Sequence, residues 1–278
     1  MNAGVVTRGD DRLDQWLVAH GHAPTRREAQ AAIMAGLVTV DGRVADKPGR
    51  RISPRMRIEV RRRDETYASR GGIKLAHALA VFGVDVRGKV AVDLGASTGG
   101  FTDCLLRAGA ARVYAVDVGR GQLSWRLRTD ARVVCLEGRN ARTLTRDDTG
   151  GPCDIVTADL AFISLRLLWR SMAGLVTDHG SVIALVKPQF EAGREKVGRG
   201  GVVRDAAVHR DVLRTVLDAA GASGLVAVGV SPSPILGPAG NVEFLAHLIP
   251  GGGTMPQEPI EAAVAQAHVL ARGRRSRT

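Results

Sequence analysis

The sequence predicts an α/β protein in which a mostly parallel sheet, covered by helices on both faces, follows a small basic module. From residue 90 onward, short apolar runs alternate with segments of helical periodicity, as in successive βαβ units. The first of these runs leads straight into a glycine-rich turn. The length of 278 residues accommodates about two domains, and basic side chains are concentrated in the first quarter of the chain.

The beginning of the chain is expected to form two short helices followed by short strands. Apolar residues recur at helical spacing in two groups, Leu13, Trp16, Leu17 and Ala29, Ala32, Ile33. Thr25 is the predicted N-cap of the second helix, and Glu28 is its capping-box partner. Alternating apolar residues then predict strands around the turn Asp41-Gly42, and these residues are Val38, Val40, Ile52, Met56, Ile58 and Val60.

Charge is concentrated in this module. The whole chain has a formal net charge of +11. Between Arg43 and Arg63 there are nine basic residues and only two acidic ones, Asp46 and Glu59. A surface of this kind suits a polyanion, most simply a nucleic acid.

The rest of the chain supplies the elements of the larger sheet. Strands are expected over 90–94, 113–118, 133–136, 155–158, 182–186, 226–230 and 243–249, and helices over 100–108, 164–176 and 205–220. After three glycines, an apolar helical pattern from Ile260 to Leu270 predicts a terminal helix with a basic end. The expected boundaries are a basic module at 10–63, a linker at 64–68, the sheet domain at 69–250, and the terminal helix and tail at 251–278.

Composition also bears on the cellular location. No apolar stretch approaches the roughly 20 residues needed to span a bilayer, and the first residues lack the basic and apolar segments of a secretion signal. The three cysteines are widely spaced and lie in apolar patterns, so neither a disulfide framework nor a zinc site is expected. We therefore expect a cytoplasmic protein without a bound metal.

The glycine-rich turn predicts a cofactor site. Residues 90–94 form a buried strand that continues into GASTGGF, and such a turn lets the backbone approach a ligand closely. An acid before the first glycine, irregular glycine spacing and an acid at the end of the second strand favour S-adenosylmethionine over a dinucleotide. This is the arrangement of class I methyltransferases. The expected contacts are Asp93, Gly95, Ser97, Gly99, Gly100 and, at the cofactor ribose, Asp117.

Four charged residues are expected to converge at the edge of the sheet where strands end. They are Lys74 in SRGGIKL, Asp159 in ADLAFISL, Lys187 in LVKPQFE and Glu243 in GNVEF. This edge is where an open α/β sheet binds ligands and carries out chemistry. A lysine that directly follows a run such as Ile183–Val186 is uncommon as a structural feature, because an apolar side chain would serve the core better.

These motifs resemble those of a known family. The run TRREAQAAIMAGLVTVDGRVADKPG resembles the S-four RNA-binding domain, and the four charged residues resemble the Lys-Asp-Lys-Glu tetrad of FtsJ-like ribose 2′-O-methyltransferases. With SRGGIKL, DLGASTGGFTD and LVKPQFEAGREKVGRGGVV, the chain resembles the TlyA family, whose members carry the names haemolysin A and ribosomal RNA (cytidine-2′-O)-methyltransferase.

The resemblance implies S-adenosylmethionine-dependent methylation of a ribose 2′-hydroxyl in ribosomal RNA. It assigns the catalytic set to Lys74, Asp159, Lys187 and Glu243, and Lys187 is expected to accept the ribose proton or to stabilise the oxyanion. The RNA contacts are expected at Arg26, Arg27, Lys47, Arg50 and Arg51. The residue patterns leave three other hypotheses open: a noncatalytic RNA-binding or ribosome-assembly factor, a methyltransferase acting on another RNA or a small molecule, and a membrane-active haemolysin.

Overall fold

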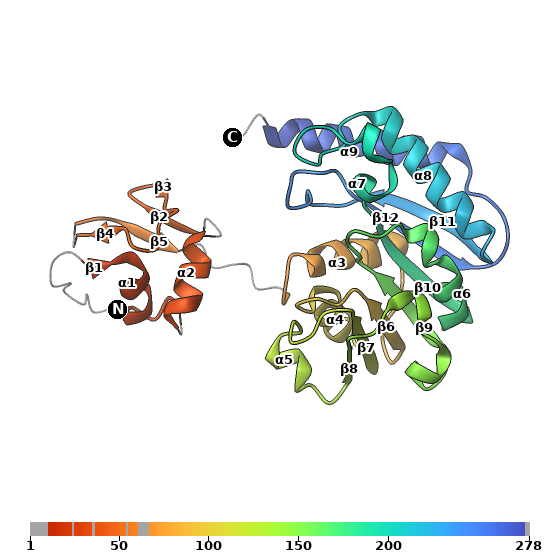
Figure 1. The fold of residues 1–278 in the computed structure, drawn as a ribbon, viewed down its shortest axis with the longest axis horizontal. Helices are drawn as coiled ribbons and strands as arrows, with labels where there is room; N and C mark the ends of the chain where they lie inside the picture. Colours follow the sequence, from red (N-terminus) through yellow and green to blue (C-terminus); the bar gives the residue numbers. More distant parts are fainter. Residues whose placement is uncertain (1–10, 24, 35–36, 54, 61–66, 276–278) are drawn as a thin grey trace. The chain divides into compact units, whose positions relative to one another are not determined.

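The computed structural model describes residues 11–275 except residues 24, 35–36, 54 and 61–66 (Figure 1). The chain divides into two units, residues 1–65 and 66–278. Each unit has its own hydrophobic core. The bases at 61–63 and the last basic residue, Arg277, lie outside the described residues.

The first unit packs two helices against short strands. Its elements are β1 (Asp11–Arg12), α1 (Leu13–Ala19), α2 (Arg26–Met34), β2 (Val38–Val40), β3 (Arg43–Val44), β4 (Arg51–Ile52) and β5 (Ile58–Val60). The oxygen of Thr25 accepts the N–H of Glu28 at 3.2 Å, so the predicted cap of α2 is present. Asp41 and Gly42 both have positive φ, 54° and 76°, as a two-residue hairpin turn requires.

The second unit contains a seven-stranded sheet in the order β11-β12-β10-β9-β6-β7-β8. All neighbouring strands are parallel except at β12, which is antiparallel to both β10 and β11. The strands are β6 (Val90–Leu94), β7 (Arg112–Asp117), β8 (Val133–Glu137), β9 (Cys153–Ala158), β10 (Val176–Val186), β11 (Leu225–Pro232) and β12 (Phe244–Pro250). The strand order reverses at β6, and this reversal opens a ligand crevice at its carboxyl end.

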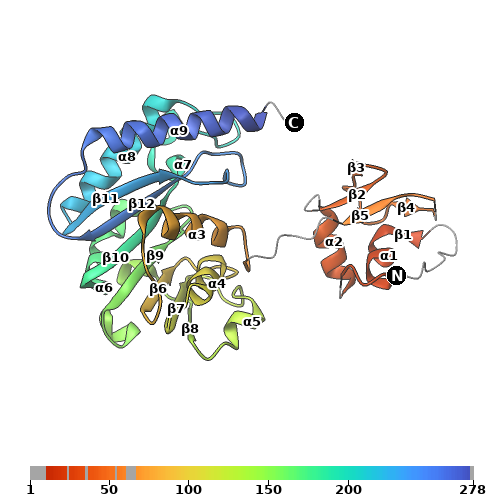
Figure 2. The same ribbon diagram turned by 180° about the vertical axis from the view of Figure 1, so that it is seen from behind.

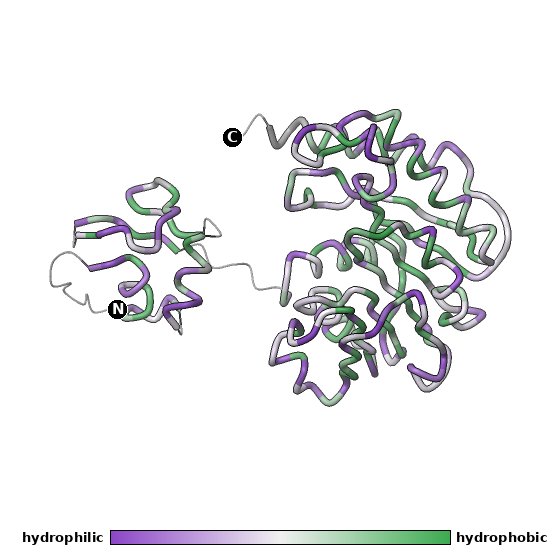
Figure 3. The backbone as a smooth tube through the Cα atoms, viewed as in Figure 1, coloured by the Kyte–Doolittle hydropathy of each residue, from purple (hydrophilic) through white to green (hydrophobic). Residues whose placement is uncertain are grey.

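Helices cover both faces of this sheet (Figure 2). One face packs against α3 (Gly71–Phe82), α4 (Gly100–Arg107) and α5 (Trp125–Arg128). The other packs against α6 (Trp169–Leu175), α8 (Ala206–Gly221) and α9 (Gln257–Arg275). A short helix, α7 (Pro188–Glu191), follows β10. The sheet strands are largely hydrophobic along their length, as expected for strands buried on both sides (Figure 3).

The structure corrects three expectations about elements. Met56 lies in a turn, where its N–H donates to the carbonyl of Ser53, and not in a strand. The helix expected over 164–176 is divided into a 3₁₀ turn at Leu165–Leu167 and α6, because the side chain of Ser164 caps the short turn. The strand expected over 182–186 begins earlier, at Val176.

Candidate functional site

The alternation of side chains along the strands places three of the predicted residues on the same face of the sheet, at one edge. Asp159 follows β9, Lys187 follows β10 and Glu243 immediately precedes the antiparallel β12. Each lies two residues from a strand residue whose side chain faces α3 and α4: Asp159 from Thr157, Lys187 from Leu185, and Glu243 from Leu245. Side chains two apart in a strand share a face. All three are therefore directed to the side that α3 covers.

Helix α3 supplies the fourth residue. The ammonium of Lys74 donates to Oε2 of Glu243 at 2.6 Å, and the two residues are only 6 % and 2 % exposed. Two charges at this depth are stable only as a hydrogen-bonded pair. This ion pair therefore fixes α3 to the start of β12, and it excludes a solvated position for Lys74.

A second ion pair joins the other two residues. Nζ of Lys187 lies 2.6 Å from Oδ1 of Asp159, and both side chains are partly exposed. The backbone N–H of Asp159 donates to the carbonyl of Leu94, at the end of the first sheet strand. Asp159 is thus positioned directly beside the glycine-rich turn.

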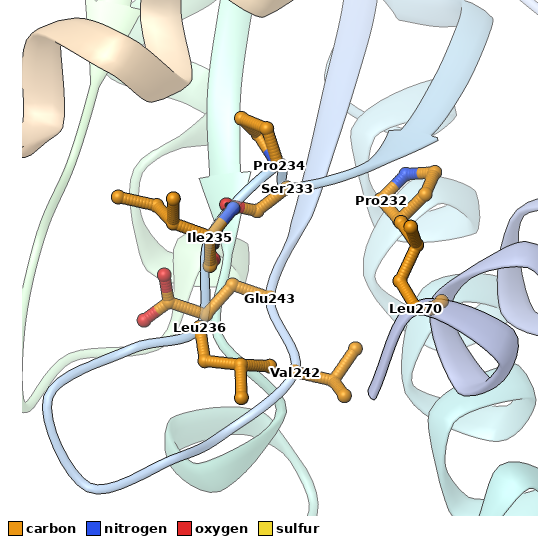
Figure 4. Close-up of a pocket in the computed structure, with 9 residues that line it drawn as sticks. Pro232, Ser233, Pro234, Ile235, Leu236, Val242, Glu243 and Leu270 are labelled. Carbon is orange, nitrogen blue, oxygen red and sulfur yellow. Dashed lines mark hydrogen bonds between the residues drawn. The ribbon is translucent and has the colours of Figure 1, made fainter. Parts of the chain in front are cut away.

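A loop covers the buried glutamate. Residues 233–242 connect β11 to β12, and the N–H of Ser233 donates to the carbonyl of Glu243. A Cβ on Gly237 would lie only 2.5 Å from Oε1 of Glu243, so this residue must be glycine for the loop to pass. In Figure 4 the carboxylate of Glu243 points away from Leu270 of α9, among residues of the same loop. The adjoining cavity is only about 10 Å³, which leaves no space for a ligand.

The glycine-rich turn is approached closely by other segments of the chain. Gly95 and Gly99 have φ of 84° and 100°, which side chains rarely tolerate. A Cβ on Gly95 would come within 2.6 Å of the carbonyl oxygen of Asp159. A Cβ on Gly100 would lie 2.1 Å from the hydroxyl of Ser69. Ser97 also has a positive φ, 48°.

Asp117 supports this turn from the end of β7. Its carboxylate accepts the N–H of Ser97 at 2.8 Å and the N–H of Gly119 at 2.7 Å. The hydroxyl of Ser97 also donates to the side-chain oxygen of Gln122 at 3.3 Å. A carboxylate has about four acceptor positions, so Asp117 keeps capacity for two further donors such as ribose hydroxyls.

Asp93 is in a different position from the one expected. It is fully buried, and its two oxygens accept the hydroxyls of Thr102 at 2.7 Å and Thr157 at 3.1 Å. Burial raises the pKa of Asp93 to about 7, and the two threonine hydrogen bonds oppose this shift. The carboxyl therefore lies beneath the turn, where it links β6, β9 and α4.

These parts enclose a cavity of about 290 Å³. Its wall is formed by Ser69, Gly71, Gly95, Ala96, Ser97, Thr98, Gly100, Phe101, Asp159, Ala161 and Lys187. The cavity thus joins the glycine-rich turn to the exposed ion pair. The predicted residues Lys74, Asp93, Gly99, Asp117 and Glu243 do not line it.

Sequence reasoning missed the wall that precedes α3. Ser69 and Gly71 line the cavity, and a Cβ on Gly72 would overlap the ring of Tyr67. The carboxylate of Asp103 accepts the N–H of Ala68 at 2.8 Å and holds this segment on α4. The consecutive glycines of SRGGIKL were the available signal, since adjacent glycines often mark a close approach between segments.

The loop that follows β7 was also missed. Glu137 accepts the N–H groups of Gly121, Gln122 and Leu123 and pairs with Arg128. The Arg128 hydrogen bond, followed by these backbone donors, lowers the pKa of Glu137 to about 2. Its position at the end of β8 was the only sequence signal.

The five basic residues expected to contact RNA lie in the first unit. Arg27, Lys47 and Arg51 are exposed, and Arg50 is half-buried. The Nε of Arg26 donates to buried Asp14 at 3.0 Å, although the arginine side chain remains 52 % exposed. Hydrogen bonding to Arg12 is the main cause of the strongly lowered pKa of Asp14. Arg26 therefore stabilises the unit as well as adding positive charge to its surface.

Comparison with known proteins gives consistent results for both units. The profile of the FtsJ-like methyltransferases matches residues 67–249, and that of the S4 domain matches residues 11–58. The 16S/23S rRNA (cytidine-2′-O)-methyltransferase TlyA of Mycobacterium tuberculosis is 45 % identical over 238 residues, which is 85 % of this chain and 89 % of that protein. Hemolysin A of Brachyspira hyodysenteriae is 38 % identical over 239 residues, which is 86 % of this chain and 99 % of that protein.

Solved structures agree with this result. A Streptococcus thermophilus protein that carries a hemolysin name superposes with a TM-score of 0.78 at 42 % identity, covering 96 % of this chain and 99 % of the other. In the part of the chain that the structure describes, no helix is long and apolar enough to cross a membrane. The sequence matches, which extend over both units, show that this chain belongs to the TlyA family of FtsJ-like methyltransferases.

Proposed function

We propose that this protein transfers a methyl group from S-adenosylmethionine to the 2′-hydroxyl of a ribose in ribosomal RNA, with cytidine as the nucleoside, in the cytoplasm. The observation that carries the proposal is the 290 Å³ cavity, in which the glycine-rich turn and the Lys187–Asp159 ion pair share one wall. A cofactor seated on the turn would thus lie beside a charged pair suited to an alcohol acceptor. The M. tuberculosis relative carries the name of this activity.

The residues present fit the cofactor. Glycines at 95 and 100 let Asp159 and Ser69 pack directly against the turn, and both of these residues line the cavity. The cavity approaches the roughly 300 Å³ at which small-molecule sites begin. We assign Asp117 to the ribose hydroxyls, because its carboxylate stands at the end of β7 with acceptor capacity remaining. S-adenosylmethionine would supply an electrophilic methyl group on a sulfonium.

Asp93 receives a supporting role in this proposal. Its oxygens are occupied by two threonine hydroxyls beneath the turn, and it does not line the cavity. The residue therefore acts on the cofactor site by holding β6, β9 and α4 in register. It does not contact the cofactor itself.

Lys187 is the residue assigned to the acceptor hydroxyl. Its ammonium lines the cavity and is held by Asp159 at 2.6 Å, so it can hydrogen-bond the ribose oxygen and stabilise the negative charge that develops there. Asp159 orients this ammonium and accepts the hydrogen bond of the ribose 2′-hydroxyl, so that its carboxylate can take the hydroxyl proton, and release it to solvent, as the oxygen gains the methyl group. Holding acceptor and donor in line supplies part of the roughly 7–11 kcal/mol that orientation can contribute.

The buried pair of Lys74 and Glu243 acts on the site indirectly, through the elements that it connects. Neither side chain lines the cavity, yet Lys74 lies one helical turn from Gly71, which does. Glu243 precedes β12, whose Phe244 pairs with Val186, the residue before Lys187. This ion pair therefore fixes the relative positions of the helix and the strand that form the wall.

RNA binding is assigned to both units, with the S4 domain providing much of the nonspecific affinity. The exposed bases Arg27, Lys47 and Arg51 suit phosphate contacts, which set affinity without reading sequence. Ribosomal RNA is the partner that this proposal names.

The test is to map ribose methylation on purified ribosomal subunits that lack the modification, with and without the protein and S-adenosylmethionine. A single new 2′-O-methyl group on a cytidine, dependent on both components and lost in Lys187→Ala, supports the proposal. If the protein binds the subunits but no ribose is methylated, it is a binding factor and the proposed chemistry is wrong.

A further inference from the structure

A second cavity, of about 370 Å³, opens beside the proposed catalytic lysine. It shares no lining residue with the cofactor cavity. One wall consists of Gln189 and Phe190 of α7, and the other of the glycine-rich segment 193–201. We call it the α7 pocket. Lys187 caps α7, and its Nζ lies 6.0 Å from the centre of the Phe190 ring, so the pocket adjoins the position of the acceptor ribose.

The walls of the α7 pocket are held in place by buried polar contacts. Asn241 is 2 % exposed, and its side chain donates to the carbonyl of Gly201 at 2.8 Å and accepts the N–H of Val203 at 3.0 Å. On the other side, the carboxylate of Glu191 accepts the hydroxyl of Ser164 at 2.6 Å and the N–H of Leu165 at 2.8 Å. Burial raises the pKa of Glu191. The cavity is therefore a formed site.

Glycines line the loop side of this pocket. Gly193 and Gly201 have φ of 81° and 73°, so these positions favour glycine. A Cβ on Gly201 would have no neighbour within 4 Å, so this glycine keeps volume open, whereas a Cβ on Gly193 would lie 2.5 Å from Oε1 of Glu195.

The pocket's side chains match two parts of a nucleotide, its base and its phosphate. Phe190 offers an aromatic face on which a base can stack. Gln189 offers an amide, and its buried Oε1 has no hydrogen-bond partner among the described residues. Arg194 is exposed at the same cavity and can bind a phosphate. A small anion would use only the arginine, and an apolar ligand would use only the ring.

We propose that the α7 pocket receives the nucleotide next to the methylated one in the RNA strand, with its base stacked on Phe190, the edge of that base at Gln189, and its phosphate at Arg194. This inference rests on the proposed function, because it requires an RNA strand whose acceptor ribose lies at Lys187. It adds a sequence-reading subsite within the catalytic unit. RNA proteins commonly read single-stranded bases by stacking and by hydrogen bonds to base edges.

The experiment combines changes in the protein with changes in the RNA. After the methylated ribose has been mapped, ribosomal subunits are prepared that carry each of the other three bases at the two flanking positions. Single-turnover methylation rates are measured with the full-length wild-type protein, Gln189→Leu, Phe190→Leu and Arg194→Ala. Gln257→Leu on α9, where the glutamine is exposed, is the matched control for Gln189→Leu.

We expect the wild-type rate to depend on the base at one flanking position by about 10-fold or more, because a base with a different edge leaves the Gln189 amide without a hydrogen-bond partner. Gln189→Leu and Phe190→Leu should slow the reaction on native subunits and abolish this dependence, whereas Gln257→Leu should keep both. Arg194→Ala should weaken binding to all sequences alike and reduce the log–log salt slope by about 1. S-adenosylmethionine affinity should be unchanged in all four variants.

The proposal is overturned if neither flanking base affects the wild-type rate, or if the dependence remains unchanged in both α7 variants. Failure of the proposed function gives a different result, since the wild-type protein would then methylate no ribose at all. An equal loss of rate on every RNA in Gln189→Leu would indicate a structural role for the glutamine and would also overturn the proposal.

Discussion

The ion pair between Lys74 and Glu243 provides the most quantitative test of how the site is built. Lys74→Met removes the ammonium and leaves the Glu243 carboxylate 2 % exposed with its 2.6 Å partner gone. Removing one member of a buried pair costs about 3–5 kcal/mol, because the remaining charge has lost both water and partner. For a domain of this size each kcal/mol corresponds to about 2–4 °C in Tm, so a loss of roughly 6–20 °C is expected.

A double variant separates the charge effect from lost packing. Lys74→Met combined with Glu243→Leu replaces both charges by apolar side chains of similar length, which is often neutral or stabilising in a protein interior. We therefore expect the double variant to regain most of the stability that Lys74→Met loses. Arg87→Met breaks an ion pair with Asp85 whose side chains are 80 % and 54 % exposed, and it should change stability little.

The assay is urea unfolding of the full-length protein, with hydrogen exchange of peptides from β10 and β12 to follow the second unit by itself. Exchange in these strands should accelerate in Lys74→Met and return toward the wild-type rate in the double variant. If Lys74→Met is no less stable than Arg87→Met, the pair is not buried as described. If the double variant is as unstable as the single one, packing and not charge explains the loss.

Four further predictions follow from the site and the first unit. Lys187→Ala should lower turnover about 10²–10⁴-fold at unchanged cofactor affinity. If Lys187→Arg restores part of the single-turnover rate, Lys187 stabilises negative charge on the ribose oxygen and does not accept its proton. Asp117→Ala should weaken S-adenosylmethionine binding about 10-fold or more by calorimetry while the protein stays folded, and unchanged affinity would remove the ribose assignment. Arg27→Gln with Lys47→Gln should reduce the log–log salt slope of RNA binding by about 1.4–1.8, and an unchanged slope would place the phosphates elsewhere. The pKa of Asp93 is about 7 in the folded protein and about 4 in the unfolded chain, so its contribution to stability is full below pH 4 and is lost as the pH rises through 7. Asp93→Asn should therefore remove this part of the pH dependence of stability, measured by urea unfolding at a series of pH values. Identical pH dependence in the wild-type protein and the variant would refute this prediction.

Much of the sheet could be predicted from the sequence because its strands are short apolar runs bounded by helices. The strand at Val90–Leu94 has the bounds expected from its apolar run, since the glycine turn marks its end. The antiparallel direction of β12 was not predicted. Strand direction depends on the connection, and the loop at 233–242 is too short for a helical crossover but long enough for an antiparallel return.

The sequence indicated that the four charged residues would lie near one another, but it did not indicate how they would pair. Asp159 and Lys187 each follow a strand, and a parallel sheet brings such positions to one edge. Glu243 begins a strand, and it reaches the same edge only because β12 is antiparallel to β10. Which lysine meets which carboxylate depends on strand order and on where α3 packs, and neither is encoded locally. Asp93 shows the same limit, because its separation from the cavity arises from Thr102 on α4 and Thr157 on a different strand.

The two ion pairs differ in exposure, and this difference indicates that one pair stabilises the fold while the other interacts with the substrate. Lys74 and Glu243 are buried and do not line the cofactor cavity, whereas Lys187 and Asp159 do. A charge sealed in the interior cannot reach an acceptor hydroxyl without breaking its pair, so its main effect is to hold α3 against β12. The pair at the cavity remains accessible, and its charges can respond to a bound ribose. Variants of Lys74 should therefore lower stability and activity together, while variants of Lys187 should lower activity with a much smaller change in stability.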